Sequence, residues 1–196
     1  VGYNLRFNPI LQEIKKKIKN KKILNVNILC GSFLPNWRSN INYTKSYSSS
    51  KKKGGGILFE LSHELDFINW LFGKYKTIFS NVSKKSNLKI SADDSADLIL
   101  KNQHNCLINL SMNLYSKLNY RFIIVNCEYM SIIGDLIENT ITISTKNNVK
   151  EKKYKLSKNY TYENQLSSFF SNKKHLCTFE EGKYVNNKIY EIEKLK

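Results

Sequence analysis

Glu60 and His63 are the pair of residues in this sequence whose types and spacing best suit proton transfer. They lie three positions apart in a stretch with helical periodicity, so both side chains would share one helix face. A carboxylate beside an imidazole fixes the ring tautomer and raises its basicity, which suits proton exchange with a hydroxyl group at neutral pH. On residue type alone, a histidine satisfied on a helix surface is the simpler alternative. Asp66 adds a charge nearby, whereas Glu64 is expected to point away and be solvated.

Three consecutive glycines, Gly54, Gly55 and Gly56, lead directly into this predicted helix. One interpretation is a phosphate bound at the helix N-terminus. Neither G-x-G-x-x-G nor G-x-x-x-x-G-K-[ST] occurs in the sequence, so a nucleotide-binding motif is not recognisable. The alternative is close packing of the backbone against another group, which glycine permits because it has no side chain.

Further candidate binding residues precede the glycines. Arg6 lies at a strand-to-helix junction, where it either faces a ligand or forms an ordinary surface ion pair. Trp37 and Arg38 lie in a long irregular stretch, residues 31–50, and stretches of this length are usually functional or disordered. A disordered loop has little use for tryptophan, which favours function. These two side chains would stack on and hydrogen-bond a sugar, or would pin the loop.

The net charge of +16 invites a nucleic-acid interpretation. Arginine is the residue that reads guanine edges and forms paired hydrogen bonds to phosphates. The sequence has only three arginines: Arg6, Arg38 and Arg121. The lysines are scattered among many asparagines and isoleucines, a composition typical of a coding bias toward A and T. We therefore expect solvated surface lysines and no nucleic-acid partner.

The cysteines and histidines do not predict a metal site. The four cysteines, none of them in a C-x-x-C pair, are Cys30, Cys106, Cys127 and Cys177. The first three lie in apolar runs and are expected in the core. No signal segment or bilayer-length apolar run is present, so a cytoplasmic protein without membrane contact is expected. Because Val1 is not methionine, we expect a fragment with a segment missing before it.

The periodicity of apolar residues predicts both helices and strands. Helices are expected over residues 9–20, 56–72, 162–170 and, as a short one, from 182 onward. Strands are expected over residues 23–30, 78–82, 96–101, 106–114, 121–127, 129–133, 136–143 and 149–156. The clearest turn signals are Gly134-Asp135 and Lys146-Asn147-Asn148. This order predicts an α+β fold, an open, largely antiparallel mixed sheet with helices packed on one face.

Taken together, these motifs resemble the glucose-fructose oxidoreductase/inositol dehydrogenase (Gfo/Idh/MocA) family. The matching segments are residues 2–9, 34–38, 42–43, 46–48 and 54–73, with looser matches at 113–116 and 134–137. The resemblance covers nearly the whole chain, and its specific part is the block from Leu34 to Gly73. It favours a functional role for Arg6, Trp37 and His63, because each now lies in its expected motif.

The resemblance implies a two-domain enzyme in which a Rossmann domain binds NAD or NADP. Residues 1–196 would be the single substrate-binding and oligomerisation domain, without that Rossmann domain, and a homo-oligomer would form through the sheet. The expected activity is hydride transfer on a sugar, sugar derivative or nucleotide sugar, with His63 as proton donor or acceptor and Glu60 at the acidic position of its motif. The expected substrate-binding residues are Asn4, Arg6, Trp37, Arg38, Tyr43 and Tyr47.

Two departures from the family pattern qualify this expectation. Glu60 stands where the family usually has aspartate, and the catalytic lysine of the family's Rossmann domain lies outside these residues. Catalysis by this chain alone is therefore not expected. The alternative is a non-catalytic binding or oligomerisation module derived from such an enzyme.

Overall fold

A computed structural model describes residues 1–171 and 175–195. Its described residues form one sheet of eight strands in the order β2-β3-β4-β1-β5-β6-β7-β8. The strands are β1 (Ile23–Phe33), β2 (Tyr75–Ser83), β3 (Ser95–Asn102), β4 (Leu107–Asn113), β5 (Tyr115–Cys127), β6 (Met130–Asp135), β7 (Thr140–Thr145) and β8 (Asn148–Lys153). Neighbouring strands pair antiparallel except β1 and β4, which run parallel. The predicted open, largely antiparallel mixed sheet is confirmed.

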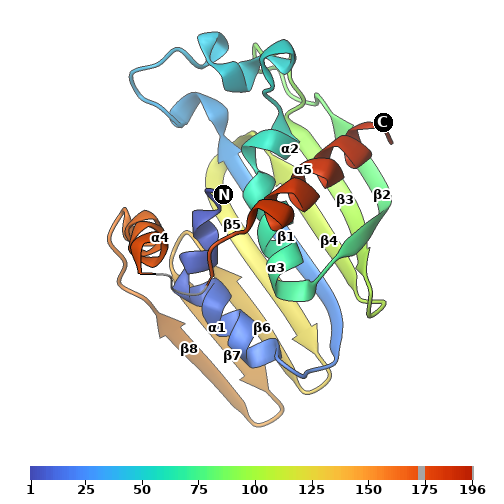
Figure 1. The fold of residues 1–196 in the computed structure, drawn as a ribbon, viewed down its shortest axis with the longest axis vertical. Helices are drawn as coiled ribbons and strands as arrows, with labels where there is room; N and C mark the ends of the chain where they lie inside the picture. The colour runs from blue at the N-terminus through green and yellow to red at the C-terminus, as the bar shows by residue number, and fades with distance from the viewer. Residues whose placement is uncertain (172–174, 196) are drawn as a thin grey trace.

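Three helices cover one face of this sheet: α1 (Pro9–Ile18), α3 (Ser62–Phe72) and α5 (Phe179–Glu193) (Figure 1). The short helix α2 (Ile57–Glu60) precedes α3, and α4 (Tyr160–Phe170) packs beside the N-terminal 3-10 turn Asn4–Phe7. The apolar stripe of α1 is buried as its spacing predicts, and the Asn8 side chain caps the helix by accepting from the Ile10 N–H.

The core lies between these helices and the central strands. Alternate residues of β1, β4 and β5 point toward the helices and are buried, as Ile28, Ile108 and Ile123 illustrate. Their neighbours along each strand face the uncovered side of the sheet and are more exposed. All four cysteines are free and buried, which confirms the core position expected for Cys30, Cys106 and Cys127.

The predicted helix over residues 56–72 is wrong in one respect, because it is two helices. The backbone of Leu61, with φ of −110° and ψ of 32°, separates α2 from α3. Gly73 ends α3 with φ of 79° and ψ of −176°, a backbone conformation that residues with a side chain rarely adopt. The break matters for the site, because it places Glu60 on α2 and His63 on α3, so the expectation that their side chains share one helix face was wrong.

The predicted turn at Gly134-Asp135 is also wrong. Both residues lie inside β6, and the turn follows them at residues 136–139. A Cβ on Gly134 would lie 2.8 Å from Cγ2 of Ile10, so glycine is needed there for α1 to pack closely on the sheet. The turn at Lys146-Asn147 is confirmed, since β7 and β8 form a hairpin around it.

The last helix, expected to be short, spans fifteen residues as α5. Its start is fixed by a capping box, in which the Thr178 hydroxyl accepts from the Glu181 N–H and the Glu181 carboxylate accepts from the Thr178 N–H. Among the described residues, no helix has both the length and the apolar character needed to cross a bilayer.

Candidate functional site

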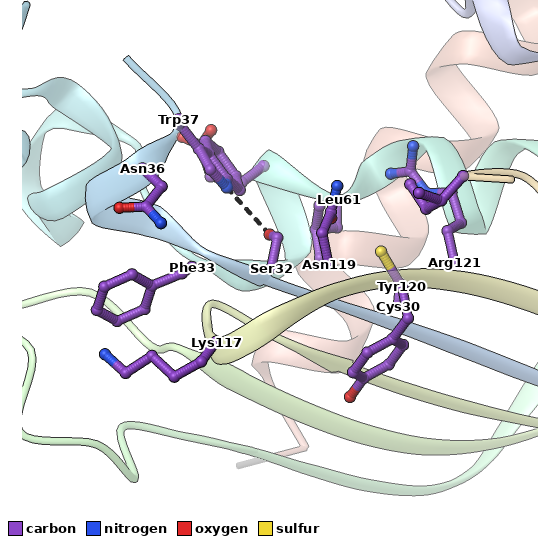
Figure 2. Close-up of a pocket in the computed structure, with 12 residues that line it drawn as sticks. Cys30, Ser32, Phe33, Asn36, Trp37, Leu61, Lys117, Asn119, Tyr120 and Arg121 are labelled. Carbon is purple, nitrogen blue, oxygen red and sulfur yellow. Dashed lines mark hydrogen bonds between the residues drawn. The ribbon is translucent and has the colours of Figure 1, made fainter. Parts of the chain in front are cut away.

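A cavity of about 470 Å³ lies beside the C-terminal end of β1 and the adjoining part of β5, next to α2 (Figure 2). This volume lies within the range typical of small-molecule binding sites. Strands β1 and β5, the segment after β1, the end of α2 with Leu61, and the turn after β6 supply the lining residues. They are Cys30, Ser32, Phe33, Asn36, Trp37, Glu60, Leu61, Lys117, Asn119, Tyr120, Arg121 and Ile137.

The pairing of β1 with β5 builds one wall of this pocket. Gly31 lies opposite Tyr120 in the register, and a Cβ on Gly31 would lie 2.3 Å from the Tyr120 ring. The Tyr120 hydroxyl accepts a hydrogen bond from the Asn113 side chain at 2.9 Å. The glycine therefore lets the tyrosine ring lie flat across β1, and the neighbouring strand holds that ring in place.

Glu60 lines the pocket from the last turn of α2. Its Oε1 atom is buried and has no hydrogen-bond partner among the described residues. Burial raises the pKa of Glu60 above its ordinary value, while Ser48 and the charge of Arg38 partly oppose this shift. The carboxyl group is thus held at a pocket wall with one oxygen unsatisfied.

His63 lies in the first turn of α3, one turn along the chain from Glu60, and does not itself line the pocket. Tyr3 packs edge-on against its imidazole, with ring centroids 5.4 Å apart. The Nδ1 atom is buried without a hydrogen-bond partner in the described part of the chain. Burial lowers the pKa of His63, and the charge of Glu64 opposes that shift, so burial favours the neutral form of the ring.

Glu64 is fully buried, so the expectation that it is solvated was wrong. Its Oε1 atom lies 2.7 Å from Nε of Arg121, and Nη2 of Arg121 donates to its Oε2 at 3.4 Å. Burial alone would lower the pKa of Arg121, but the Glu64 charge raises it, which keeps the guanidinium charged. Arg121 reaches the pocket from β5 (Figure 2) and is a candidate binding residue that sequence reasoning missed.

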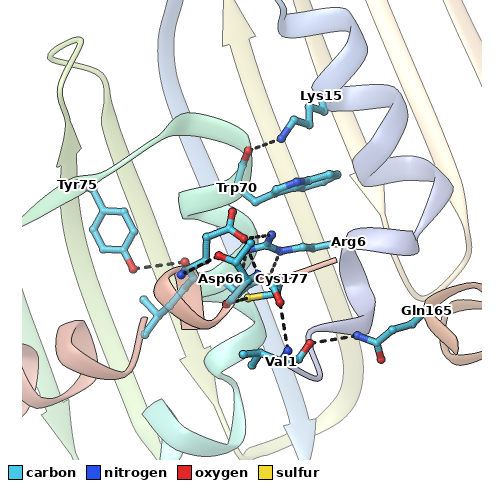
Figure 3. Close-up of polar contacts among 11 residues, drawn as sticks. Val1, Arg6, Lys15, Asp66, Trp70, Tyr75, Gln165 and Cys177 are labelled. Carbon is cyan, nitrogen blue, oxygen red and sulfur yellow. Dashed lines mark hydrogen bonds and ion pairs between the residues drawn. The ribbon is translucent and has the colours of Figure 1, made fainter. Parts of the chain in front are cut away.

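Arg6 lies outside the pocket, among buried charged groups (Figure 3). It is 1% exposed, and its Nη2 and Nε atoms donate to the two carboxylate oxygens of Asp66 at 2.7 and 3.0 Å. Nη1 donates to Glu181 of α5 at 2.9 Å. The structure thus gives Arg6 a buried ion pair between the N-terminal turn, α3 and α5, rather than the surface ion pair considered as an alternative.

Asn4 also lies away from the pocket. It is 5% exposed, and its side-chain amide donates to the Thr161 hydroxyl of α4 at 2.7 Å. Asn4 and Arg6 therefore connect the N-terminal turn to the helices. In the described residues they are not brought together with Glu60, and a contact of either side chain with a ligand stays a prediction.

The remaining predicted binding residues lie along the segment after β1. Trp37 lines the pocket, and its Nε1–H donates to the Ser32 hydroxyl at 3.0 Å. Arg38 and Tyr43 line a narrow hollow next to the pocket, which shares Trp37 with it. The Tyr47 ring is half exposed, and the Arg38 guanidinium lies 5.7 Å from its centroid. The structure thus gathers Glu60, Trp37, Arg38 and Tyr43 at one end of the sheet.

The glycine run serves close packing. A Cβ on Gly55 would lie 2.4 Å from the Tyr47 carbonyl oxygen, and Gly54 and Gly56 adopt φ angles of 85° and 132°. The run joins the loop to α2 and brings Ser48 close to Glu60. Of the two interpretations of the glycines, close approach of the backbone is therefore the one that the structure supports.

Comparisons with known proteins agree with this fold. The sequence profile of the GFO/IDH/MocA C-terminal domain matches residues 11–135. An uncharacterised oxidoreductase of Synechocystis sp. is 28% identical over 123 residues, which cover 56% of this chain and 33% of that protein. The chain thus spans about a third of this curated relative.

Two solved structures show the same fold at low sequence identity. UDP-N-acetylglucosamine 3-dehydrogenase from Acidithiobacillus ferrooxidans superposes with a TM-score of 0.75 at 12% identity, covering 98% of this chain and 59% of that one. A levoglucosan dehydrogenase in complex with NADH and levoglucosan has a TM-score of 0.67 at 17% identity, and the match covers 79% of this chain and 46% of that one. Since the family profile spans more than half of the sequence, this chain belongs to the GFO/IDH/MocA family of oxidoreductases and represents its C-terminal domain.

Proposed function

We propose that this chain is the substrate-binding part of an NAD(P)-dependent oxidoreductase that acts on a sugar, sugar derivative or nucleotide sugar by hydride transfer. His63 exchanges a proton with the substrate hydroxyl, and Glu60 orients that hydroxyl. Membership of an oxidoreductase family and the sugar and nucleotide-sugar substrates named for two proteins of the same fold support the substrate class.

One observation carries the assignment of the two residues. Glu60 and His63 each keep a buried polar atom without a hydrogen-bond partner in the described residues, Oε1 and Nδ1 respectively. An unsatisfied buried polar atom costs roughly 1–3 kcal/mol, so such atoms are rarely retained in a folded protein. A sugar hydroxyl both donates and accepts, so it is a group that can satisfy a carboxylate oxygen or an imidazole nitrogen.

The proton step follows from the state of His63. A neutral imidazole can accept the hydroxyl proton as the substrate carbon is oxidised, and in the opposite direction the protonated ring returns it. The charges of Glu64 and Arg121, which form an ion pair, act on the pKa of His63 in opposite directions. Trp37 offers an aromatic surface for the sugar at the other side of the pocket.

The nicotinamide group, when bound, supplies the hydride acceptor or donor. Close packing accounts for the glycine run of this chain, because a Cβ on Gly55 would meet the backbone carbonyl groups of Tyr47 and Ser48. We therefore assign NAD or NADP to the Rossmann domain that is the expected partner of this one. In the described residues, no group of three or more histidine, cysteine, aspartate or glutamate side chains could hold a metal ion.

The uncovered face of the sheet supports a homo-oligomer. Apolar side chains on this face include Leu29, Leu107 and Ile133, which are 41%, 44% and 45% exposed. Hydrogen-bonded asparagines lie between them, with Asn109 donating to Asn27 at 2.9 Å and Asn126 to Asn25 at 2.8 Å. A second copy could bury this mixed surface. Light scattering on the purified protein, with Leu29→Lys as the variant, tests this proposal.

Assays of the chain joined to its Rossmann domain test the proposed function. We expect NAD(P)-dependent oxidation or reduction of at least one member of a panel of free sugars, sugar acids and nucleotide sugars. The alternative, a non-catalytic binding module, predicts sugar binding without turnover for the whole panel. Free, buried cysteines are compatible with the cytoplasmic location proposed for the enzyme.

A further inference from the structure

A second hollow, of about 540 Å³, lies between the loop of residues 44–53 and the loop of residues 84–91, at the end of the sheet where the first loop projects (Figure 1). Four lysines line it: Lys45, Lys53, Lys84 and Lys89. Five of its other lining residues carry a hydroxyl group, and none of the lining residues is acidic. We call it the lysine hollow.

Hydrogen bonds between the two loops hold the shape of the lysine hollow. The Ser91 N–H donates to the Ser49 carbonyl at 2.9 Å, and the Lys51 N–H donates to the Ser91 hydroxyl at 3.2 Å. At the other end, the Lys89 N–H donates to the Tyr43 hydroxyl at 3.3 Å. These hydrogen bonds therefore fix the backbone of the two loops that carry the lysines.

Carboxylates close to the lysine hollow are engaged elsewhere. Asp93 pairs with Lys51 at 3.7 Å and Asp97 with Lys85 at 2.9 Å, and neither of these lysines lines the hollow. Asp94 is fully buried and accepts from the Lys85 N–H and from the Ser86 N–H and hydroxyl. The four lining lysines thus present a positive field that the nearby acidic groups do not neutralise.

The lysine hollow continues toward the Glu60 pocket. The narrow hollow lined by Arg38 shares Trp37 with the pocket and Ser46 with the lysine hollow. A ligand whose sugar lies at Glu60 could therefore extend along Trp37 and Ser46 to the lysines. Lysine ammonium groups and hydroxyl donors are the groups that bind phosphate oxygens.

We infer that the lysine hollow binds phosphoryl groups. Resting on the function proposed above, we assign them to the substrate, which is then a sugar carrying a phosphate or diphosphate, as in a nucleotide sugar, rather than a neutral free sugar. Lys53 and Lys89, one from each loop, grip the phosphoryl oxygens, while Glu60 and Trp37 hold the sugar.

Nuclear magnetic resonance on the ¹⁵N-labelled protein tests this assignment with three probes: inorganic pyrophosphate, UDP-N-acetylglucosamine and N-acetylglucosamine. We expect pyrophosphate and the nucleotide sugar to shift the amide signals of residues 44–53 and 84–91 saturably. Only the nucleotide sugar should also shift the indole N–H signal of Trp37 and bind more tightly than pyrophosphate. The neutral sugar should leave both loops unchanged.

The double variant Lys53→Gln/Lys89→Gln should weaken pyrophosphate binding by roughly tenfold or more, equivalent to about 1.4 kcal/mol. The matched control Lys16→Gln/Lys150→Gln removes the same charge from exposed positions outside the hollow and should bind as the unmodified protein does. Absence of saturable binding by both phosphorylated probes, or equal weakening in the two variants, would overturn the phosphoryl site. Pyrophosphate binding without a Trp37 shift from the nucleotide sugar would overturn its assignment to the substrate. Neither result depends on turnover, so the proposed enzymatic function stands or fails separately.

Discussion

Nε of Arg121 lies 2.7 Å from Oε1 of Glu64. Arg121 lies on β5 and lines the pocket that contains Glu60, whereas Glu64 follows His63 on α3. Glu64 is fully buried and Arg121 is 21% exposed, so the carboxylate depends on this guanidinium for compensation. The ion pair therefore links the helix of the candidate catalytic histidine to the sheet.

Replacing Arg121 by leucine should lower the free energy of unfolding by about 3–5 kcal/mol, because it leaves a buried carboxylate unpaired. Urea denaturation measures this change. The exposed pair of Lys22 and Glu128, 3.3 Å apart, provides the control, and Lys22→Ala should change stability by less than about 1 kcal/mol. Equal effects of the two substitutions would contradict the structural role of the Arg121–Glu64 pair.

Arg6 should behave as a stabilising residue. The Arg6 guanidinium donates hydrogen bonds to both carboxylate oxygens of Asp66. Arg6→Met leaves this buried carboxylate unpaired, so it should lower the free energy of unfolding by about 3–5 kcal/mol. Arg6→Lys should recover only part of this loss, because an ammonium group cannot form the same two parallel hydrogen bonds. Full recovery by lysine in thermal denaturation would show that geometry at Asp66 does not matter.

His63 should stay neutral to lower pH than an ordinary histidine, since burial lowers its pKa. Between that lowered pKa and the unfolded value of about 6.5, the unfolded chain binds more protons than the folded one. Stability should therefore rise with pH through this window and fall as pH drops below about 6.5. Titration of the imidazole C–H signals measures the pKa, and His63→Asn should flatten this part of the stability profile. A pKa at or above 6.5 would disagree with the burial of the ring.

Gly55→Ala should disturb the site loop, because the new Cβ would lie 2.4 Å from the Tyr47 carbonyl oxygen. We expect a loss of stability of about 1–3 kcal/mol and shifted amide signals across residues 46–49. Gly2→Ala is the control, since no atom lies within 4 Å of a Cβ at that position. Matching behaviour of the two variants would argue against close packing at the glycine run.

The fold was largely predictable because most elements carry local signals. The apolar stripe of α1, the alternation in β1 and the lysine-asparagine turn before β8 all act within a few residues. Gly134 misled the turn prediction because its role depends on α1, which lies more than a hundred residues earlier in the chain. Short-range patterns carry no information about such a contact.

The candidate site was only partly predictable for the same reason. Glu60 and Trp37 stand in recognisable motifs, and both line the pocket. The prediction that Glu64 is solvated was wrong because helical periodicity does not reveal the break at Leu61. Its ion-pair partner Arg121 also lies on β5, far away in the sequence. Only the pairing of β1 with β5 brings Arg121 to the pocket, and that pairing is set by the sheet as a whole.

Turnover of the His63→Ala variant, in the chain joined to its Rossmann domain, tests the central claim most directly. If His63 exchanges the proton of the substrate hydroxyl, kcat should fall by roughly 10²- to 10⁴-fold while the affinity for NAD or NADP stays unchanged. Circular dichroism and the melting temperature verify that the variant is folded. Turnover of a folded His63→Ala enzyme within a few-fold of the unmodified enzyme would contradict the proposed role of His63.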